Sequence, residues 1–72
     1  MDNKTTKILQ LGRKIFTIRK QRKYSQNKLA EMLDISREHL AKIETAKRCI
    51  SLGLLIDIAD KLDVQVKDLI DF

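Results

Sequence analysis

The sequence predicts an all-α protein, a compact domain of five short helices, on three observations. The 72 residues include no proline and only two glycines. Apolar residues recur at steps of three and four, the spacing of a helix with one buried face, and few stretches alternate as a strand would. Short polar segments of about two to six residues separate these repeats, as in ordinary helical domains. At this length we expect a single domain over residues 1–72.

The first helix is indicated by Ile8, Leu11, Ile15 and Ile18, which step by three, four and three. This spacing gives the helix one apolar face toward the core. Gly12 is a poor helix former, so the helix could start as late as Gly12.

Two short helices follow, each preceded by a serine suited to the N-cap. Ser25 precedes the helix expected over 26–33, and Ser36 precedes one that carries Leu40 and Ile43 inward. Asp34 and Ile35 break the pattern between them, and an aspartate tolerates the left-handed backbone that ends helices. Two short helices joined by so short a turn are the arrangement of a helix-turn-helix, here over about 25–44. Its second, recognition helix would cover about 36–44.

Two further helices complete the prediction. Ser51 would cap a fourth helix, with Asp63 ending it and with an inward set of Leu52, Leu55, Ile58, Ala59 and Leu62. A last helical turn or two is expected over 67–72. Val64, Leu69 and Ile70 would close the core there.

Charge is unevenly distributed along the chain. Residues 1–48 hold 13 Lys and Arg against 5 Asp and Glu, a formal charge of +8, whereas residues 49–72 hold 2 against 5, or −3. A positive field over part of a small domain attracts polyanions such as nucleic acid, although solubilising surface charge is an equal alternative. Charge alone therefore leaves the partner open.

Several other classes of protein find no support in the sequence. Cys49 is the single cysteine and His39 the single histidine, so no metal site is expected, and we expect no cofactor. No nucleophile, dyad or phosphate loop indicates an enzyme. The start, residues 1–7, is polar and lacks the apolar run of a signal peptide, and no stretch could span a membrane. A cytoplasmic location is the expectation, with a lone thiol suited to that reducing compartment.

In detail the chain resembles the phage repressor and Cro family, of the xenobiotic-response-element type. The matching segments are RKQRKYSQNKLAEML, the turn DIS, REHLAKIE, TAKR and SLGLLIDIADKLDVQVKDLI, within about residues 8–71. The resemblance implies a lambda-repressor-like, five-helix DNA-binding domain. The chain departs from the family pattern at four positions: Asp34 and Ala46 replace usual glycines, Ile50 replaces a usual proline, and Gly53 replaces a helix former.

The resemblance also implies roles for individual residues. Arg37, Glu38 and Lys42 would read base edges, although Glu38 could equally tune or pair with neighbouring arginines. Arg19 and Glu44 match a paired arginine and glutamate that join the first and third helices. Contacts to the DNA backbone are implied for Gln26, Ser36, Lys47 and Arg48.

These expectations lead to a sequence-specific regulator that binds double-stranded DNA, with a homodimer on an inverted repeat as its expected form. Leu54 and Ile56 make the fourth helix apolar on more than one face. In the family, this region commonly forms the dimer contact. The candidates are Leu54, Val66, Ile70 and Phe72, for which core packing is the alternative. Two other readings remain: the DNA-binding antitoxin of a toxin–antitoxin pair, which would add a protein partner, and a protein-interaction module.

Overall fold

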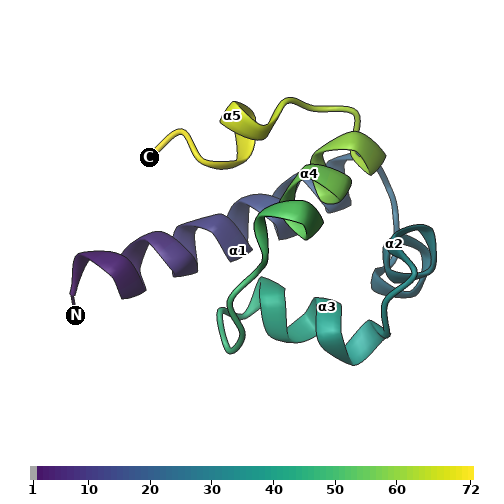
Figure 1. The fold of residues 1–72 in the computed structure, drawn as a ribbon. Helices are drawn as coiled ribbons and strands as arrows, with labels where there is room; N and C mark the ends of the chain where they lie inside the picture. Colours follow the sequence, from purple (N-terminus) through teal and green to yellow (C-terminus); the bar gives the residue numbers. More distant parts are fainter. Residues whose placement is uncertain (1) are drawn as a thin grey trace.

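The structure, a computed structural model, describes residues 2–72 and contains helices but no strand over that range. A long first helix is followed by four shorter ones, and the chain then turns back so that its C-terminus lies over α1 (Figure 1). The prediction of an all-α, five-helix domain is confirmed. The helices are α1 (Asn3–Gln21), α2 (Gln26–Leu33), α3 (Arg37–Glu44), α4 (Leu52–Lys61) and α5 (Val66–Leu69).

Helix α1 begins at Asn3, so a start as late as Gly12 is wrong. The Asp2 carboxylate caps the helix by accepting a hydrogen bond from the Thr5 amide at 2.7 Å. This backbone hydrogen bond lowers the pKa of Asp2 below its ordinary value. Gly12 does not interrupt α1, which runs without a break from its N-cap at Asp2 to Gln21.

Gly12 instead permits a close approach between α1 and the end of α3. A Cβ atom at Gly12 would lie only 2.7 Å from the carbonyl oxygens of both Ile43 and Glu44. Any larger residue would therefore push the two backbones apart. Gly53 differs from Gly12, because nothing lies within 4 Å of the place where its Cβ would be.

Helices α2, α3 and α4 each start at a serine, as predicted. The hydroxyls of Ser25, Ser36 and Ser51 accept from the backbone amide three residues later, at 3.0, 3.0 and 3.1 Å. Each hydroxyl satisfies one of the amides that a helix start leaves without a partner.

Within residues 2–72, four residues other than glycine adopt the left-handed backbone conformation just after a helix. Their φ angles are 63° at Lys23, 57° at Asp34, 62° at Ala46 and 58° at Asp63. Asp34 and Ala46 are the two positions at which the resemblance expects glycine, so the turns keep their geometry without it. For an alanine this conformation is strained by roughly 1 kcal/mol or more.

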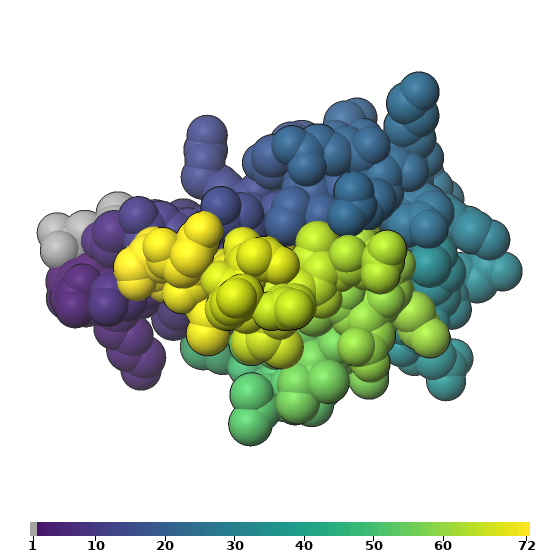
Figure 2. All heavy atoms as spheres, turned by 90° about the horizontal axis from the view of Figure 1, so that it is seen from above, coloured from purple at the N-terminus to yellow at the C-terminus, as the bar shows by residue number. Residues whose placement is uncertain are grey.

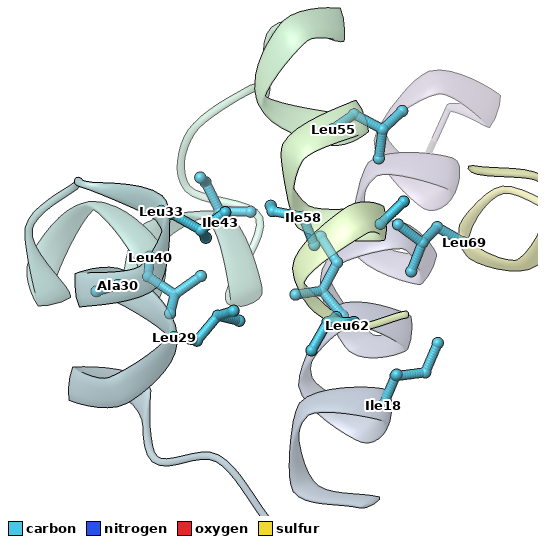
Figure 3. Close-up of a cluster of buried hydrophobic side chains, with 12 residues drawn as sticks. Ile18, Leu29, Ala30, Leu33, Leu40, Ile43, Leu55, Ile58, Leu62 and Leu69 are labelled. Carbon is cyan, nitrogen blue, oxygen red and sulfur yellow. The ribbon is translucent and has the colours of Figure 1, made fainter. Parts of the chain in front are cut away.

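The core lies between α1, the α2–α3 pair and α4, and Leu69 of α5 covers one side of it (Figure 3). The prediction that Leu52 and Ile70 belong to the core is wrong. Leu52 is 70% exposed because it is the first residue of α4, beyond the part of the helix that meets the core. Ile70 is 44% exposed because α5 ends at Leu69, not at residue 72, and Leu69 is the residue of α5 that is fully buried. The buried apolar residues are Ile15, Ile18, Leu29, Ala30, Leu33, Leu40, Ile43, Leu55, Ile58, Ala59, Leu62 and Leu69.

The C-terminal residues lie against the first part and the middle of α1 (Figure 2). An exposed ion pair joins them, with 3.4 Å between Lys14 Nζ and Asp71 Oδ1. None of the helices within residues 2–72 combines the length and the apolar character needed to cross a membrane. Within the same residues no group of three or more His, Cys, Asp and Glu side chains is placed to hold a metal ion.

Candidate nucleic-acid interface

The exposed side of α3 carries the side chains for which the family resemblance implies base reading. Arg37, Glu38 and Lys42 are exposed, and together with Lys47 they line a shallow hollow on the surface. Glu38 and Lys42, which are four residues apart, lie opposite the buried Leu40 and Ile43, and Arg37 lies to one side of them at the first residue of α3. Helical periodicity explains this division, because residues three and four apart share a face. The arrangement gives a two-turn helix with cations along its outer side.

The starts of α2 and α3 add hydrogen-bond donors suited to anions. At a helix N-terminus the first amides lack carbonyl partners within the helix, and the helix dipole is positive there. The Ser36 hydroxyl accepts from the His39 amide and keeps its own hydrogen for donation. Ser36 is exposed, so a phosphate oxygen can reach it.

A buried ion pair fixes α3 to α1. Arg19 Nε donates to Glu44 Oε2 at 2.7 Å, and a second guanidinium nitrogen donates to Oε1 at 3.1 Å. The third nitrogen donates to the Tyr24 carbonyl at 2.9 Å. The Phe16 ring packs on the guanidinium, 5.2 Å from its centroid to Arg19 Cζ. This pair leaves α3 little freedom to turn about its axis.

Gln26 belongs to the same network. Its Nε2 donates to Glu44 Oε1 at 2.9 Å, which connects the first turn of α2 to the last turn of α3. Sequence reasoning assigned Gln26 to a phosphate and missed this bond. The two residues are 18 positions apart, so no local pattern could indicate it. The contact between the Phe16 ring and the Arg19 guanidinium could have been predicted, because Phe16 precedes Arg19 by three residues on the same helix.

The loop after α3 sends its two cations in different directions. Lys47 and Arg48 are both exposed, and Lys47 lies with the α3 face. Arg48 instead lines another hollow, next to Lys4 and Lys7 from the start of α1. Only Lys47 therefore extends the exposed face of α3 directly.

The four candidate dimer residues divide into two kinds. Leu54 and Val66 are half-buried and pack against the core, while Ile70 and Phe72 are 44% and 39% exposed. On α4 the exposed apolar side chains are Leu52 and Ile56, which are four residues apart and share a helix face. Sequence reasoning assigned Leu52 to the core and so missed it here.

Two short helices at a tight turn, with the second held by a buried pair and exposing a basic face, define the helix-turn-helix class. The chain matches the helix-turn-helix family over residues 15–69, and it belongs to that family.

Curated relatives agree with this assignment. The control protein C.BamHI of Bacillus amyloliquefaciens is 40% identical over 65 residues, which is 89% of this chain and 80% of the relative. The immunity repressor protein of Bacillus phage phi105 is 40% identical over 60 residues, 83% of this chain. An HTH-type transcriptional regulator of Rickettsia conorii is 40% identical over 53 residues, 74% of this chain. The chain spans 42% of the length of each of these last two relatives. These relatives are regulators and not enzymes, in keeping with the sequence.

Among solved structures, the restriction-modification controller protein C.AhdI from Aeromonas hydrophila has the same fold. Its TM-score is 0.85 at 23% identity, over 89% of this chain and 97% of that chain. The clp gene regulator ClgR from Corynebacterium glutamicum has a TM-score of 0.83 at 24% identity, over 85% of this chain and 65% of that chain.

Proposed function

We propose that this protein is a transcriptional regulator that binds a specific sequence of double-stranded DNA, with α3 in the major groove. The observation that carries the proposal is the exposed face of Arg37, Glu38 and Lys42 on a helix fixed by the Arg19–Glu44 pair. A helix of this width fits the major groove, where each base pair presents a distinct pattern of donors and acceptors. Family membership and the names of the relatives support it.

The proposed contacts follow the chemistry of each side chain. The Arg37 guanidinium presents a planar fork that matches guanine O6 and N7, and Glu38 is an acceptor suited to cytosine N4. Lys42 lies about one and a half turns from Arg37, so both side chains can enter one groove. Ser36, Lys47 and Arg48 are proposed to hold phosphates, which position the protein without reading sequence. For Gln26 the proposal is a phosphate contact by the amide group that Glu44 already orients.

We further propose a homodimer that reads an inverted repeat. Large apolar side chains remain exposed to water in the monomer, and exposed apolar surface often marks a protein–protein contact. They include Leu52, Ile56, Ile70 and Phe72. Half-buried Leu54 and Val66 pack against the core and keep part of their surface in water. In such a dimer the half-site centres would be about 34–36 Å apart, one turn of DNA.

Among regulators, the comparisons favour a controller of the kind that accompanies restriction–modification genes. The fold of C.AhdI, a controller protein, is matched over 97% of that chain. C.BamHI, also called a control protein, is matched over 80% of its length.

The test is selection of bound sequences from a random duplex library at a stated salt concentration. We expect a short inverted repeat to emerge, and affinity for it to fall steeply with salt, because each neutralised phosphate contributes about −0.9 to the slope of log affinity against log salt. Lys67→Gln is the matched control, since Lys67 lies beside Asp63 and Asp68, away from the α3 face, and should leave the slope unchanged. Enrichment of no sequence, with a flat salt response, would instead indicate a protein-interaction module. Enrichment that requires a second protein would indicate an antitoxin.

A further inference from the structure

A hollow of about 390 Å³ lies where the start of α1 meets the loop after α3 and the C-terminal residue. We propose that it binds a small anionic amphiphile, a free fatty carboxylate of medium chain length, with the acid group at Arg48. The volume falls at the lower end of the range of small-molecule sites. The hollow is lined by Lys4, Lys7, Ile8, Leu11, Ile43, Arg48, Cys49, Ile50 and Phe72.

The walls of the hollow are apolar and come from separate parts of the chain. Ile8 and Leu11 belong to α1, Ile43 to the end of α3 and Ile50 to the loop before α4. Ile8, Leu11 and Ile50 are only half-buried, so the domain's own core does not use all of their surface. An alkyl chain in the hollow would remove that surface from water, the main source of affinity for an apolar ligand.

The charged side chains that line the hollow are all cations. Lys4 and Lys7 are three residues apart on α1, and Arg48 comes from the loop. No Asp or Glu is among the lining residues. A carboxylate fits this set, because arginine can bind both carboxylate oxygens in one plane. Charge therefore selects an anionic head group, and the walls select an alkyl tail.

The combination of apolar walls and three cations favours an amphiphile as the ligand over DNA alone. Backbone phosphates could occupy the three cations, but they would leave Ile8, Leu11 and Ile50 as exposed as before. A ligand with a head and a tail accounts for both features of the hollow.

A regulatory consequence follows, and it rests on the proposed function. Arg48 is a proposed phosphate contact, and a bound carboxylate would occupy it. Ligand and DNA would then compete for the same guanidinium, so the ligand should lower affinity for the operator.

Cys49 offers a direct measure of occupancy without DNA. It is exposed, lines the hollow and is the only cysteine. We expect decanoate, below its micelle concentration, to slow the reaction of Cys49 with N-ethylmaleimide several-fold and saturably. Decanol and decyltrimethylammonium should slow it much less, because they lack the negative charge. Lys7→Gln should weaken the protection by decanoate, and Lys20→Gln, a cation on α1 outside the hollow, should not.

Three results would overturn the site: no protection by decanoate, equal protection by decanol, or protection by phosphatidylglycerol vesicles alone. Loss of protection in Lys7→Gln counts only if circular dichroism shows unchanged helix content, and Leu11→Gln provides a second variant that alters the wall and not the charge. In the second arm, decanoate should lower the affinity for the selected duplex several-fold. Protection of Cys49 with unchanged DNA affinity would retain the site and overturn its regulatory role. If no duplex is selected, the protection assay still decides the site.

Discussion

Arg19 and Glu44 meet side-on across α1 and α3, with two guanidinium nitrogens facing the two carboxylate oxygens at 2.7 and 3.1 Å. Their side chains are only 5% and 2% exposed. At such burial each charge depends on the other, because water no longer solvates either of them.

Replacing Glu44 by glutamine should therefore destabilise the fold strongly. The variant leaves the Arg19 charge buried without its partner, and we expect a loss of about 3–5 kcal/mol in denaturant unfolding. Asp71→Asn removes the acid of the exposed Lys14–Asp71 pair and is the control, with an expected loss below about 1 kcal/mol. Equal, small losses from both variants would show that burial of the Arg19–Glu44 pair does not govern stability.

The two glycines should respond oppositely to alanine. Gly12→Ala places a methyl group 2.7 Å from two carbonyl oxygens of the α3 backbone, which cannot move aside as a side chain could. Overpacking of this kind costs about 1–3 kcal/mol. Gly53→Ala meets nothing and gains helix propensity, so it should stabilise by about 0.5–1 kcal/mol. Thermal unfolding of both variants checks the prediction, and a stabilised Gly12→Ala protein would contradict the close approach of α1 to α3.

Ala46→Gly should stabilise the domain. Its φ of 62° is strained for alanine and ordinary for glycine. We expect a gain of about 0.5–1 kcal/mol in denaturant unfolding, after part of the relief is offset by the more flexible unfolded chain. Ala41→Gly, inside α3, is the matched control and should lose about 1 kcal/mol. The same sign for both would mean that backbone strain at Ala46 is negligible.

Substitutions at Arg37 and Lys47 should affect DNA binding differently, because Arg37 is proposed to recognise a base pair and Lys47 to contact the DNA backbone. Arg37→Ala should cost about 1–3 kcal/mol in DNA binding and relax the preference at one base pair. Lys47→Ala should weaken binding to all sequences alike and lower the salt slope by about 1. Competition against every single-base variant of the selected duplex distinguishes them. An unchanged preference in Arg37→Ala, with an altered one in Lys47→Ala, would mean that α3 is wrongly placed in the groove.

The dimer proposal predicts that Ile56→Asp lowers self-association. Ile56 is 43% exposed on α4, so a charge there should affect the folded monomer little and oppose burial between two copies. Sedimentation should show dimers for the parent protein and monomers for the variant, with weaker operator binding. Leu54→Asp should give the same outcome with some loss of stability, because Leu54 also packs on the core. A parent protein that stays monomeric at high micromolar concentration, with and without DNA, would exclude the symmetric complex.

Local signals in the sequence account for the parts of the fold that were predicted correctly. The starts of α2, α3 and α4 follow from Ser25, Ser36 and Ser51, each of which acts on an amide three residues away. The outward face of α3 likewise follows from periodicity. The start of α1 was missed because its cap, Asp2, lies in a segment that resembles a polar tail.

Long-range contacts account for the parts that could not be predicted. The Gln26–Glu44 bond joins residues on different helices, and periodicity within one helix contains no information about it. The exposure of Leu52 depends on where α4 meets the core and not on its spacing from Leu55. The hollow beside Cys49 requires three separate segments to meet, so only the folded chain shows it.

Because of the close approach at Gly12, the residues that position α3 differ from the residues that are proposed to recognise the DNA sequence. The position of α3 is set on its inner side, by the carbonyls of Ile43 and Glu44 against Gly12, whereas the proposed base-reading side chains project from its outer side. Exposed positions usually change stability by no more than about half a kcal/mol when substituted. Arg37, Glu38 and Lys42 can therefore be exchanged in combination while the helix stays in place. One such domain could thus be retargeted to new operators, in evolution or in the laboratory, without being redesigned.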